Sequence, residues 1–196
     1  MRKGERTKQT IIEKSIPLFN QHGYQATSMS DIMKETGLEK GGIYRHFQSK
    51  EELSVQAFLH SIQLMRQQFQ EHVFSKQTAV EQCAAFIFVI KQLMFNRPIP
   101  GGCPVLNASL EADDANPVLA NLSKEAMSKL LAAYQKVLKD GIARGELDPS
   151  TPLEALSVLW LSSLEGALAL SRLYQDEKYI DLIGEHLQQD LRRYLL

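Results

Sequence analysis

Residues 40 to 47 gather side chains that can donate hydrogen bonds to acidic or polar groups. The stretch consists of Lys40, Gly41, Gly42, Ile43, Tyr44, Arg45, His46 and Phe47. Ammonium, guanidinium, imidazole and phenol groups bind phosphate oxygens and base edges, and glycine lets a backbone approach a ligand closely. In a helix, Ile43 and Phe47 lie four positions apart and face inward together, so the polar groups face outward. The stretch therefore predicts a docking surface for an acidic polymer such as DNA.

A second short helix must come before this one and hold it. Ser28, with Asp31 three residues later, forms the pattern of a capping box, which predicts a helix start at Ser28. Ile32 and Met33 supply its buried side, and Gly37 is the residue best able to end it in a left-handed conformation. The two helices, joined by a tight turn, predict a helix-turn-helix over residues 28 to 47.

The charge distribution supports this interpretation better than the total charge does. The 196-residue chain has a net charge of -1. Residues 1 to 50 contain nine Lys or Arg against five Asp or Glu, a balance of +4, while the remaining residues contain thirteen against eighteen, a balance of -5. A basic head on an acidic body concentrates the attraction for polyanions at one end of the chain. The alternative for such charges alone is an ordinary solvated surface.

Other classes of protein receive little support. Five histidines form no His-Glu-x-x-His pattern, and the chain has no nucleophile elbow and no Gly-rich phosphate loop after a strand. We therefore expect no enzyme, no metal and no cofactor. The basic N-terminus leads into no signal-type apolar core, and no charge-free run approaches the ~18 residues of a membrane span. We expect a cytoplasmic protein without a membrane partner, whose Cys83 and Cys103 are ordinary thiols.

Helical periodicity dominates the chain, so we expect an all-α fold of about nine helices. Apolar residues recur at helical spacing, and caps, prolines and glycines mark the ends. The expected helices are 5–22, 28–36, 39–47, 49–73, 77–95, 103–112, 117–145, 152–171 and 177–195, with a Pro- and Gly-rich break over 96–102 and a turn over 113–116.

The segment from Gly37 to Leu53, which reads Gly-Leu-Glu-Lys-Gly-Gly-Ile-Tyr-Arg-His-Phe-Gln-Ser-Lys-Glu-Glu-Leu, resembles the DNA-binding signature of the TetR/AcrR family of transcriptional regulators. The lead-in from His22 to Ser28 matches the same family. The resemblance covers roughly the first quarter of the chain and implies a three-helix DNA-binding domain over 1–48, with a connecting helix over 49–73. Residues 74–196 would then form a helical domain for ligand binding and dimerisation.

The resemblance also implies roles for individual residues in DNA binding. Phosphate contacts would come from Thr27, Ser28, Tyr44, His46 and Lys50, and base edges would be approached by Lys40, Gly41, Gly42 and Arg45. Arg45 is the candidate for bidentate recognition of a guanine. Gly42 stands where relatives often carry Thr, Ser or Ala, which places one of these contacts in question.

The last two helices are expected to form a homodimer through an intermolecular four-helix bundle. The predicted interface is Leu156, Trp160, Ser163, Leu164, Ala167, Ile183, Leu187 and Leu191. Small residues at 162, 163, 166 and 167 would permit close approach of another helix. The alternative is that the same apolar stripes are buried within one chain. A dimer would bind a near-palindromic operator.

The body of the chain is expected to bind a small-molecule effector of unknown identity. Aromatic and Met side chains suit adaptable apolar pockets, although such residues more often form plain core. The candidate ligand-binding residues are Phe58, Met65, Phe69, Phe86, Ile90, Met94, Cys103, Asn107, Tyr134, Trp160 and Glu165.

Together these features predict a repressor that an inducer releases from its operator, by shifting the start of the connecting helix at Ser49. Two alternatives remain at this point. One is a helical protein-interaction adaptor that does not bind DNA. The other is a redox-sensing regulator in which Cys103, at an expected helix start after Gly101 and Gly102, is the sensor.

Overall fold

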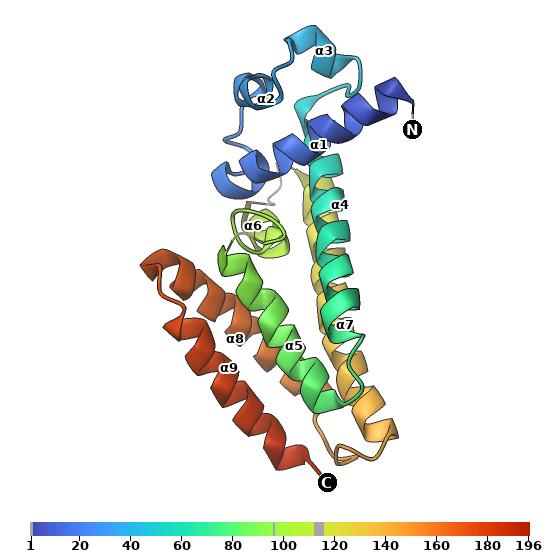
Figure 1. Ribbon diagram of the computed structural model, residues 1–196, viewed down its shortest axis with the longest axis vertical. Helices are drawn as coiled ribbons and strands as arrows, with labels where there is room; N and C mark the ends of the chain where they lie inside the picture. Colours follow the sequence, from blue (N-terminus) through green and yellow to red (C-terminus); the bar gives the residue numbers. More distant parts are fainter. Residues whose placement is uncertain (1, 96, 112–115) are drawn as a thin grey trace. The chain divides into compact units, whose positions relative to one another are not determined.

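The computed structural model describes residues 2–95, 97–111 and 116–196, and over these residues the fold is all-α with nine α-helices and no β-strand. The prediction of an all-α chain of about nine helices is confirmed. The helices are α1 (Lys3–His22), α2 (Met29–Thr36), α3 (Lys40–Tyr44), α4 (Lys50–Gln68), α5 (Ala79–Gln92), α6 (Pro104–Glu111), α7 (Pro117–Ala143), α8 (Leu153–Tyr174) and α9 (Lys178–Leu191) (Figure 1).

The predicted boundaries differ from the observed ones mainly at helix ends. The connecting helix ends as a π-helix over Phe69–Val73, and α5 and α9 continue as short 3-10 turns over Leu93–Phe95 and Arg192–Tyr194. Short 3-10 turns are common at helix termini, whereas a π-helical turn is rare. The predicted end of the sixth helix at Ala112, the start of the break at Asn96 and most of the turn over 113–116 lie outside the described residues.

The chain divides into two compact units. The first comprises Met1–Met65 and Ile99–Lys124, and the second comprises Arg66–Pro98 and Glu125–Leu196. The first unit therefore includes α6 as well as the helix-turn-helix, whereas the division expected from the sequence assigned everything after residue 73 to a C-terminal domain. We call the two parts the N-terminal unit and the C-terminal unit.

The core of the N-terminal unit forms where α1 packs against α2. Ile11, Phe19 and Ile32 are almost completely buried there. Tyr24, in the loop after α1, stacks on Phe19 with ring centroids 5.5 Å apart and meets Phe58 of α4 edge-on at 6.4 Å. Aromatic pairs at these separations add to the stabilisation from burial. Burial also raises the pKa of the Tyr24 hydroxyl, with a further contribution from the nearby Glu111 carboxylate, so the phenol stays neutral.

In the C-terminal unit, α5, α8 and α9 lie side by side (Figure 1). A chain of buried rings runs through its core, with centroid distances of 4.8 Å from Phe69 to Phe86, 5.4 Å from Phe86 to Tyr134 and 4.8 Å from Tyr134 to Trp160. The Cys83 thiol donates to the Tyr134 hydroxyl at 3.6 Å, and burial raises the pKa of Cys83 to about 12. This thiol is protonated at neutral pH.

The apolar stripe that the sequence assigned to a dimer interface faces the interior of the C-terminal unit. Six of its residues are at most 3% exposed, while Ser163 and Ile183 are half-buried. The six are Leu156, Trp160, Leu164, Ala167, Leu187 and Leu191. The prediction of these six as dimer contacts is therefore wrong, because they already fill the core formed by α8, α9 and their neighbours.

A second stripe on α8 is exposed instead. Leu159 and Leu173 are 46% and 74% exposed, and Ala155, Ser162, Gly166 and Ala169 lie between or beside them at alternating spacings of three and four. This spacing is the a/d pattern of a helix-helix seam. By length and composition α8 is also apolar enough to cross a membrane, with a mean hydropathy of 1.4 over 18 residues, but 44% of that window is buried in the unit. A core helix with a second apolar face satisfies the same test.

Candidate nucleic-acid interface

The start and the end of α2 follow the predicted capping chemistry. The Ser28 hydroxyl accepts a hydrogen bond from the Asp31 backbone N–H at 3.2 Å, and the Asp31 carboxylate accepts from the Ser28 hydroxyl at 2.6 Å and from its N–H at 2.9 Å. These bonds hold the pKa of Asp31 below its ordinary value, the hydroxyl contributing most. Gly37 ends the helix at φ 72°, a left-handed conformation that glycine adopts without strain. Helix α2 is therefore fixed at both ends.

The recognition helix α3 is shorter than predicted. It ends at Tyr44, and Arg45 and His46 continue in a turn in which the N–H groups of His46 and Phe47 both donate to the Ile43 carbonyl, at 2.9 and 3.2 Å. Two adjacent glycines disfavour a longer helix. The predicted inward pair is confirmed, since Ile43 and Phe47 are 1% and 2% exposed.

The outward face of α3 carries most of the predicted DNA-contacting groups. Lys40, Gly41 and Arg45 are exposed, Tyr44 is 39% exposed, and Gly42 and His46 are half-buried. The Lys40 ammonium lies 5.8 Å from the centroid of the Tyr44 ring, within the range of a cation–π contact. A Cβ added at Gly41 would meet nothing within 4 Å. The backbone of α3 is therefore open to close approach by a ligand.

The first turns of α1 lie beside the end of α3. The Lys8 ammonium lies 5.2 Å from the centroid of the Phe47 ring, and a Cβ built on Gly4 would lie 4.0 Å from Cε1 of His46. This placement brings the basic N-terminal segment onto the same part of the N-terminal unit as the recognition helix. Lys3 and Arg6 were not among the predicted DNA contacts. With Thr7 and Thr10 they recur at spacings of three and four, so they share one helix face.

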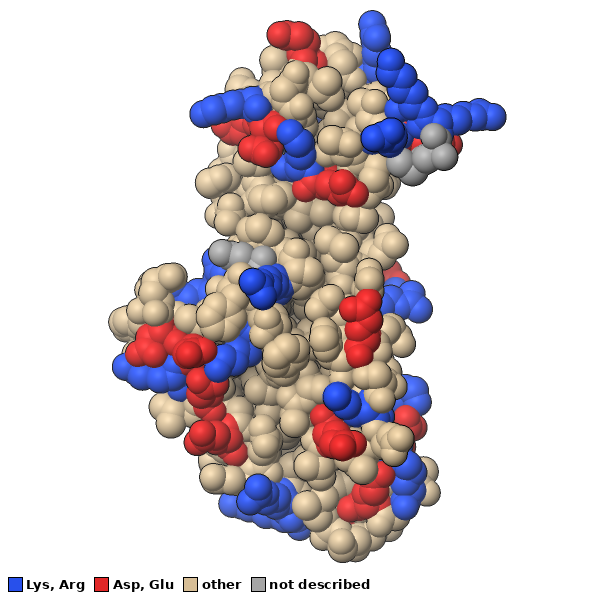
Figure 2. Space-filling model, viewed as in Figure 1, with Lys and Arg blue, Asp and Glu red and all other residues tan. Residues whose placement is uncertain are grey.

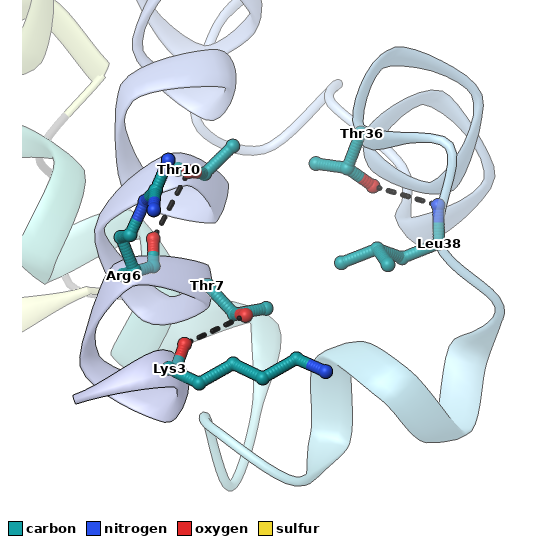
Figure 3. Close-up of a pocket in the computed structure, with 6 residues that line it drawn as sticks. All are labelled: Lys3, Arg6, Thr7, Thr10, Thr36 and Leu38. Carbon is teal, nitrogen blue, oxygen red and sulfur yellow. Dashed lines mark hydrogen bonds between the residues drawn. The ribbon is translucent and has the colours of Figure 1, made fainter.

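A shallow cleft of about 530 Å³ opens between α1 and the α2–α3 turn. It is lined by Lys3, Arg6, Thr7, Thr10, Thr36 and Leu38. Figure 3 shows the Lys3 side chain extending from the first turn of α1 across this cleft. The threonine hydroxyls donate to backbone carbonyls, as Thr7 does to Lys3 and Thr10 does to Arg6. The charged donors available at the cleft are therefore the ammonium of Lys3 and the guanidinium of Arg6.

The cations around α3 differ from those elsewhere in their partners. Among the described residues 2 to 50, no Lys or Arg lies within 4.0 Å of a carboxylate oxygen in an ion pair, and every described ion pair belongs to the C-terminal unit. Figure 2 shows Lys and Arg side chains standing out from the part of the view that holds α1 and α3, with Asp and Glu side chains on the same face. Cations without carboxylate partners remain available to bind phosphate.

Thr27 and Lys50 are placed differently from the prediction. Thr27 is 1% exposed, and its hydroxyl donates to the carbonyls of Leu18 and Gly23, so it fixes the loop and presents no donor at the surface. The Lys50 ammonium donates to the carbonyls of Tyr24, Gln25 and Thr27 at 3.0 to 3.1 Å. An ammonium has three protons, and all three are used inside the protein. The structure thus gives both residues internal roles in place of the expected phosphate contacts.

The predicted effector residues belong to both units. Phe58, Met65, Cys103 and Asn107 belong to the N-terminal unit, and the others belong to the C-terminal unit. The latter are Phe69, Phe86, Ile90, Met94, Tyr134, Trp160 and Glu165. Asn107 uses its amide group to bond Asn20 and Gly101, which gives it a structural role. Cys103 is 3% exposed, so its side chain is not on the surface that a sensor thiol would need.

A different cleft lies on the surface of the C-terminal unit. It measures about 480 Å³ and is lined by His72, Lys76, Glu81, Ala84, Ala85 and Phe88. His72 meets the half-exposed Phe88 ring edge-on, with centroids 5.3 Å apart. Sequence reasoning named none of these residues, because a half-exposed ring at helical spacing has the pattern of an ordinary core position.

Comparison with known proteins identifies the family. Residues 11–57 match the model of bacterial regulatory proteins of the tetR family, and residues 79–187 match the tetracyclin repressor-like C-terminal domain. The chain is 27% identical to the HTH-type transcriptional repressor ComR of Escherichia coli over 84% of its own length and 82% of that protein. It is 28% identical to the HTH-type transcriptional regulator YxaF of Bacillus subtilis over 95% and 96% of the two chains.

Solved structures agree with the family models. A TetR transcriptional regulator from Chloroflexus aurantiacus superposes with a TM-score of 0.94 at 35% identity, covering 100% of this chain and 98% of that one. A mutant of the TetR family regulator CifR in complex with a 26-base-pair operator DNA has the same fold, with a TM-score of 0.81 at 17% identity over 92% and 94% of the chains. The chain therefore belongs to the TetR family of bacterial regulatory proteins and is a helix-turn-helix transcriptional regulator.

Proposed function

We propose that the protein is a sequence-specific DNA-binding repressor that a small-molecule inducer releases from a near-palindromic operator. The observation that carries this proposal is the unpaired basic surface around α3, whose inward residues Ile43 and Phe47 leave Lys40, Tyr44 and Arg45 facing outward. A cation without a carboxylate partner binds phosphate without first breaking an internal ion pair. A relative named as a transcriptional repressor, ComR, supports the direction of regulation.

The contacts divide by chemistry. Arg45 is the proposed reader of base edges, because its guanidinium fits the two acceptors of guanine. Lys40, Gly41 and Gly42 are the other groups proposed to approach the bases. Tyr44 and His46 are the proposed phosphate contacts, because both donors of Ser28 are already bonded to the Asp31 carboxylate. Lys3 and Arg6 join this set as cations of the cleft beside the α2–α3 turn.

A homodimer would present two such surfaces to one operator. TetR-family regulators are typically dimeric, and we propose that the exposed stripe of α8 forms the contact together with Leu182 of α9, which is 62% exposed. Ser162 and Gly166 on this stripe allow close approach, since a Cβ at Gly166 would meet nothing within 4 Å. A two-fold axis would place the recognition helices on half-sites roughly 34 to 36 Å apart, or farther.

The C-terminal unit is the proposed site of effector binding. The ring chain from Phe69 to Trp160 supplies apolar, polarisable surface for a small ligand once the rings separate. In this scheme the ligand shifts the start of α4 at Ser49 and changes the separation of the recognition helices. By linkage, an inducer that lowers operator affinity by a given factor is itself bound more weakly by the same factor when DNA is present.

This function needs neither catalysis nor a cofactor, and we propose a cytoplasmic regulator and not an enzyme. The test is selection of duplexes from a random-sequence DNA pool by the full-length protein, followed by sequencing. We expect enrichment of a near-palindromic site, and candidate inducers should reduce retention of that site. Failure to enrich any sequence, with no retention of duplex DNA at low salt, would leave the adaptor alternative and refute the proposal.

A further inference from the structure

The loop that joins α1 to α2 is held from one side by Lys50. This residue opens α4, and its ammonium donates to the carbonyls of Tyr24 at 3.1 Å, Gln25 at 3.0 Å and Thr27 at 3.0 Å. The loop carbonyls therefore converge on one positive charge. Hydrogen bonds to a charged group are worth more than bonds between neutral groups.

The N–H groups of the same loop converge on a negative charge. The Glu111 carboxylate, at the last residue of α6, accepts from the N–H of Tyr24 at 2.8 Å and from the N–H of Gln25 at 3.3 Å. The loop thus has its carbonyls bound by a cation from α4 and its amides bound by an anion from α6. Each of the two charges is satisfied by backbone dipoles.

Glycine at position 23 makes room for this carboxylate. A Cβ added at Gly23 would lie 2.8 Å from an Oε atom of Glu111. Gly23 also has φ 99°, a backbone conformation that residues other than glycine rarely adopt. The backbone conformation at position 23 favours glycine, and the absence of a side chain there leaves room for the Glu111 carboxylate.

A second set of bonds fixes α6 to the last turn of α1. Asn107 lies four residues before Glu111, on the same face of α6, and its amide donates to the backbone carbonyl and to Oδ1 of Asn20 and to the carbonyl of Gly101, each at 3.0 Å. The Asn20 amide in turn donates to the carbonyls of Pro100 at 2.7 Å and Gly102 at 3.0 Å. Residues on one face of α6 therefore form hydrogen bonds both with the end of α1 and with the loop that follows it.

We propose that Glu111 is a positioning residue for DNA recognition, because with Lys50 it clamps the loop that leads into Ser28, the N-cap of α2. The loop sets where α2 begins, and α2 with its fixed turn sets where α3 lies. The inference rests on the proposed DNA-binding function and assigns α6 a part in it. Glu111 touches no DNA in this scheme; it acts by keeping the loop in one conformation before DNA arrives.

The experiment compares full-length Glu111→Ala and Glu111→Gln with the wild type. The control is Glu125→Ala, which removes the same charge from an exposed pair with Lys129 on α7. Three quantities are measured for each: hydrogen exchange at the amides of Tyr24 and Gln25 in the free protein, affinity for a duplex that the wild type selects from a random pool, and the thermal unfolding midpoint.

For Glu111→Ala we expect exchange at these two amides to accelerate and operator affinity to fall by about tenfold, the size associated with losing charge-assisted hydrogen bonds. The salt dependence of binding should be unchanged, since no phosphate contact is lost. Glu111→Gln keeps an acceptor oxygen and should recover most of the affinity. Glu125→Ala should match the wild type in exchange and in affinity.

Operator binding by Glu111→Ala equal to that of the wild type would overturn the inference. A loss of affinity that Glu111→Gln does not recover, and that follows only the fall in unfolding midpoint, would also overturn it, because that result describes a purely structural residue. If the wild type selects no duplex, the proposed function itself fails. The exchange rates at Tyr24 and Gln25 would still show separately whether the clamp exists.

Discussion

The two units differ in whether their described cations form ion pairs. In the C-terminal unit Lys91 is paired with both Glu177 and Asp181, and Arg144 with Glu146. In the described part of the first 50 residues no cation has a carboxylate partner, and Lys8 and Lys40 lie over aromatic rings instead. Positive charge without an internal partner raises the local potential and suits an external polyanion. The difference separates a surface kept for a ligand from a surface that is balanced internally.

The largest expected effect tests the inward stripe of α8 against the outward one. Trp160 is completely buried and packs against Tyr134, so Trp160→Ala should lower the free energy of unfolding by about 3–5 kcal/mol. In the dissociated monomer, Leu173→Ala, at a position 74% exposed in the single chain, should change the free energy of unfolding by at most about 0.5 kcal/mol. Chemical denaturation measures both. Equal losses would mean that the two stripes are not distinguished as the structure has them.

The next effect tests the reading of bases by the N-terminal unit. Arg45→Ala should cost about 1–3 kcal/mol of discrimination between the selected duplex and a duplex with altered half-sites. Arg193, which is paired with Asp190 in the C-terminal unit, provides the matched control, and Arg193→Ala should leave discrimination intact. Competition binding with both duplexes measures the discrimination between them. If Arg45→Ala discriminates between the two duplexes as well as the wild type does, residues other than Arg45 read the bases.

A smaller effect tests the contribution of single unpaired cations. Arg6→Ala should weaken binding to all duplexes and reduce the slope of log affinity against log salt concentration by about 1. Lys129→Ala removes a cation that is paired with Glu125 and should leave the slope unchanged. Titrations at several salt concentrations give both slopes. A slope that responds equally to the two substitutions would erase the contrast between the units.

The smallest effect concerns the cap of α2. The pKa of Asp31 is lowered in the folded protein by its bonds from Ser28, so its stabilisation is present above the pKa of the unfolded aspartate and is lost as pH falls through the folded value. Asp31→Asn should therefore be less stable than the wild type at neutral pH and should approach it in acid. Thermal melts across pH 2 to 7 test this. A stability difference that is constant with pH would argue against the carboxylate as the cap.

Local chemistry made the helix-turn-helix readable from the sequence. Ser28 with Asp31, Gly37, and the pair Ile43 and Phe47 each act over three or four residues, so their pattern is complete within the stretch that forms the structure. The length of α3 was overestimated because the cost of the two glycines was not weighed against the apolar spacing.

The wrong predictions concern residues whose partners lie far away in the sequence. The sequence near Lys50 does not indicate that its ammonium binds carbonyls of residues 24 to 27. Asn107 likewise bonds Asn20, which lies more than eighty positions away. On α8 two apolar stripes run in parallel, and spacing alone does not say which one the rest of the chain covers. The stripe that contains Trp160 is buried, and the stripe that contains Ser162 and Gly166 is exposed.

The most direct test of the central claim is the salt dependence of operator binding by the wild-type protein. If the unpaired cations of the N-terminal unit bind phosphates, log affinity falls linearly as log salt concentration rises, with a slope of about -0.9 for each phosphate neutralised. We predict a steep negative slope that corresponds to several phosphates. Duplex binding that does not change with salt, or no duplex binding at low salt, would contradict the account.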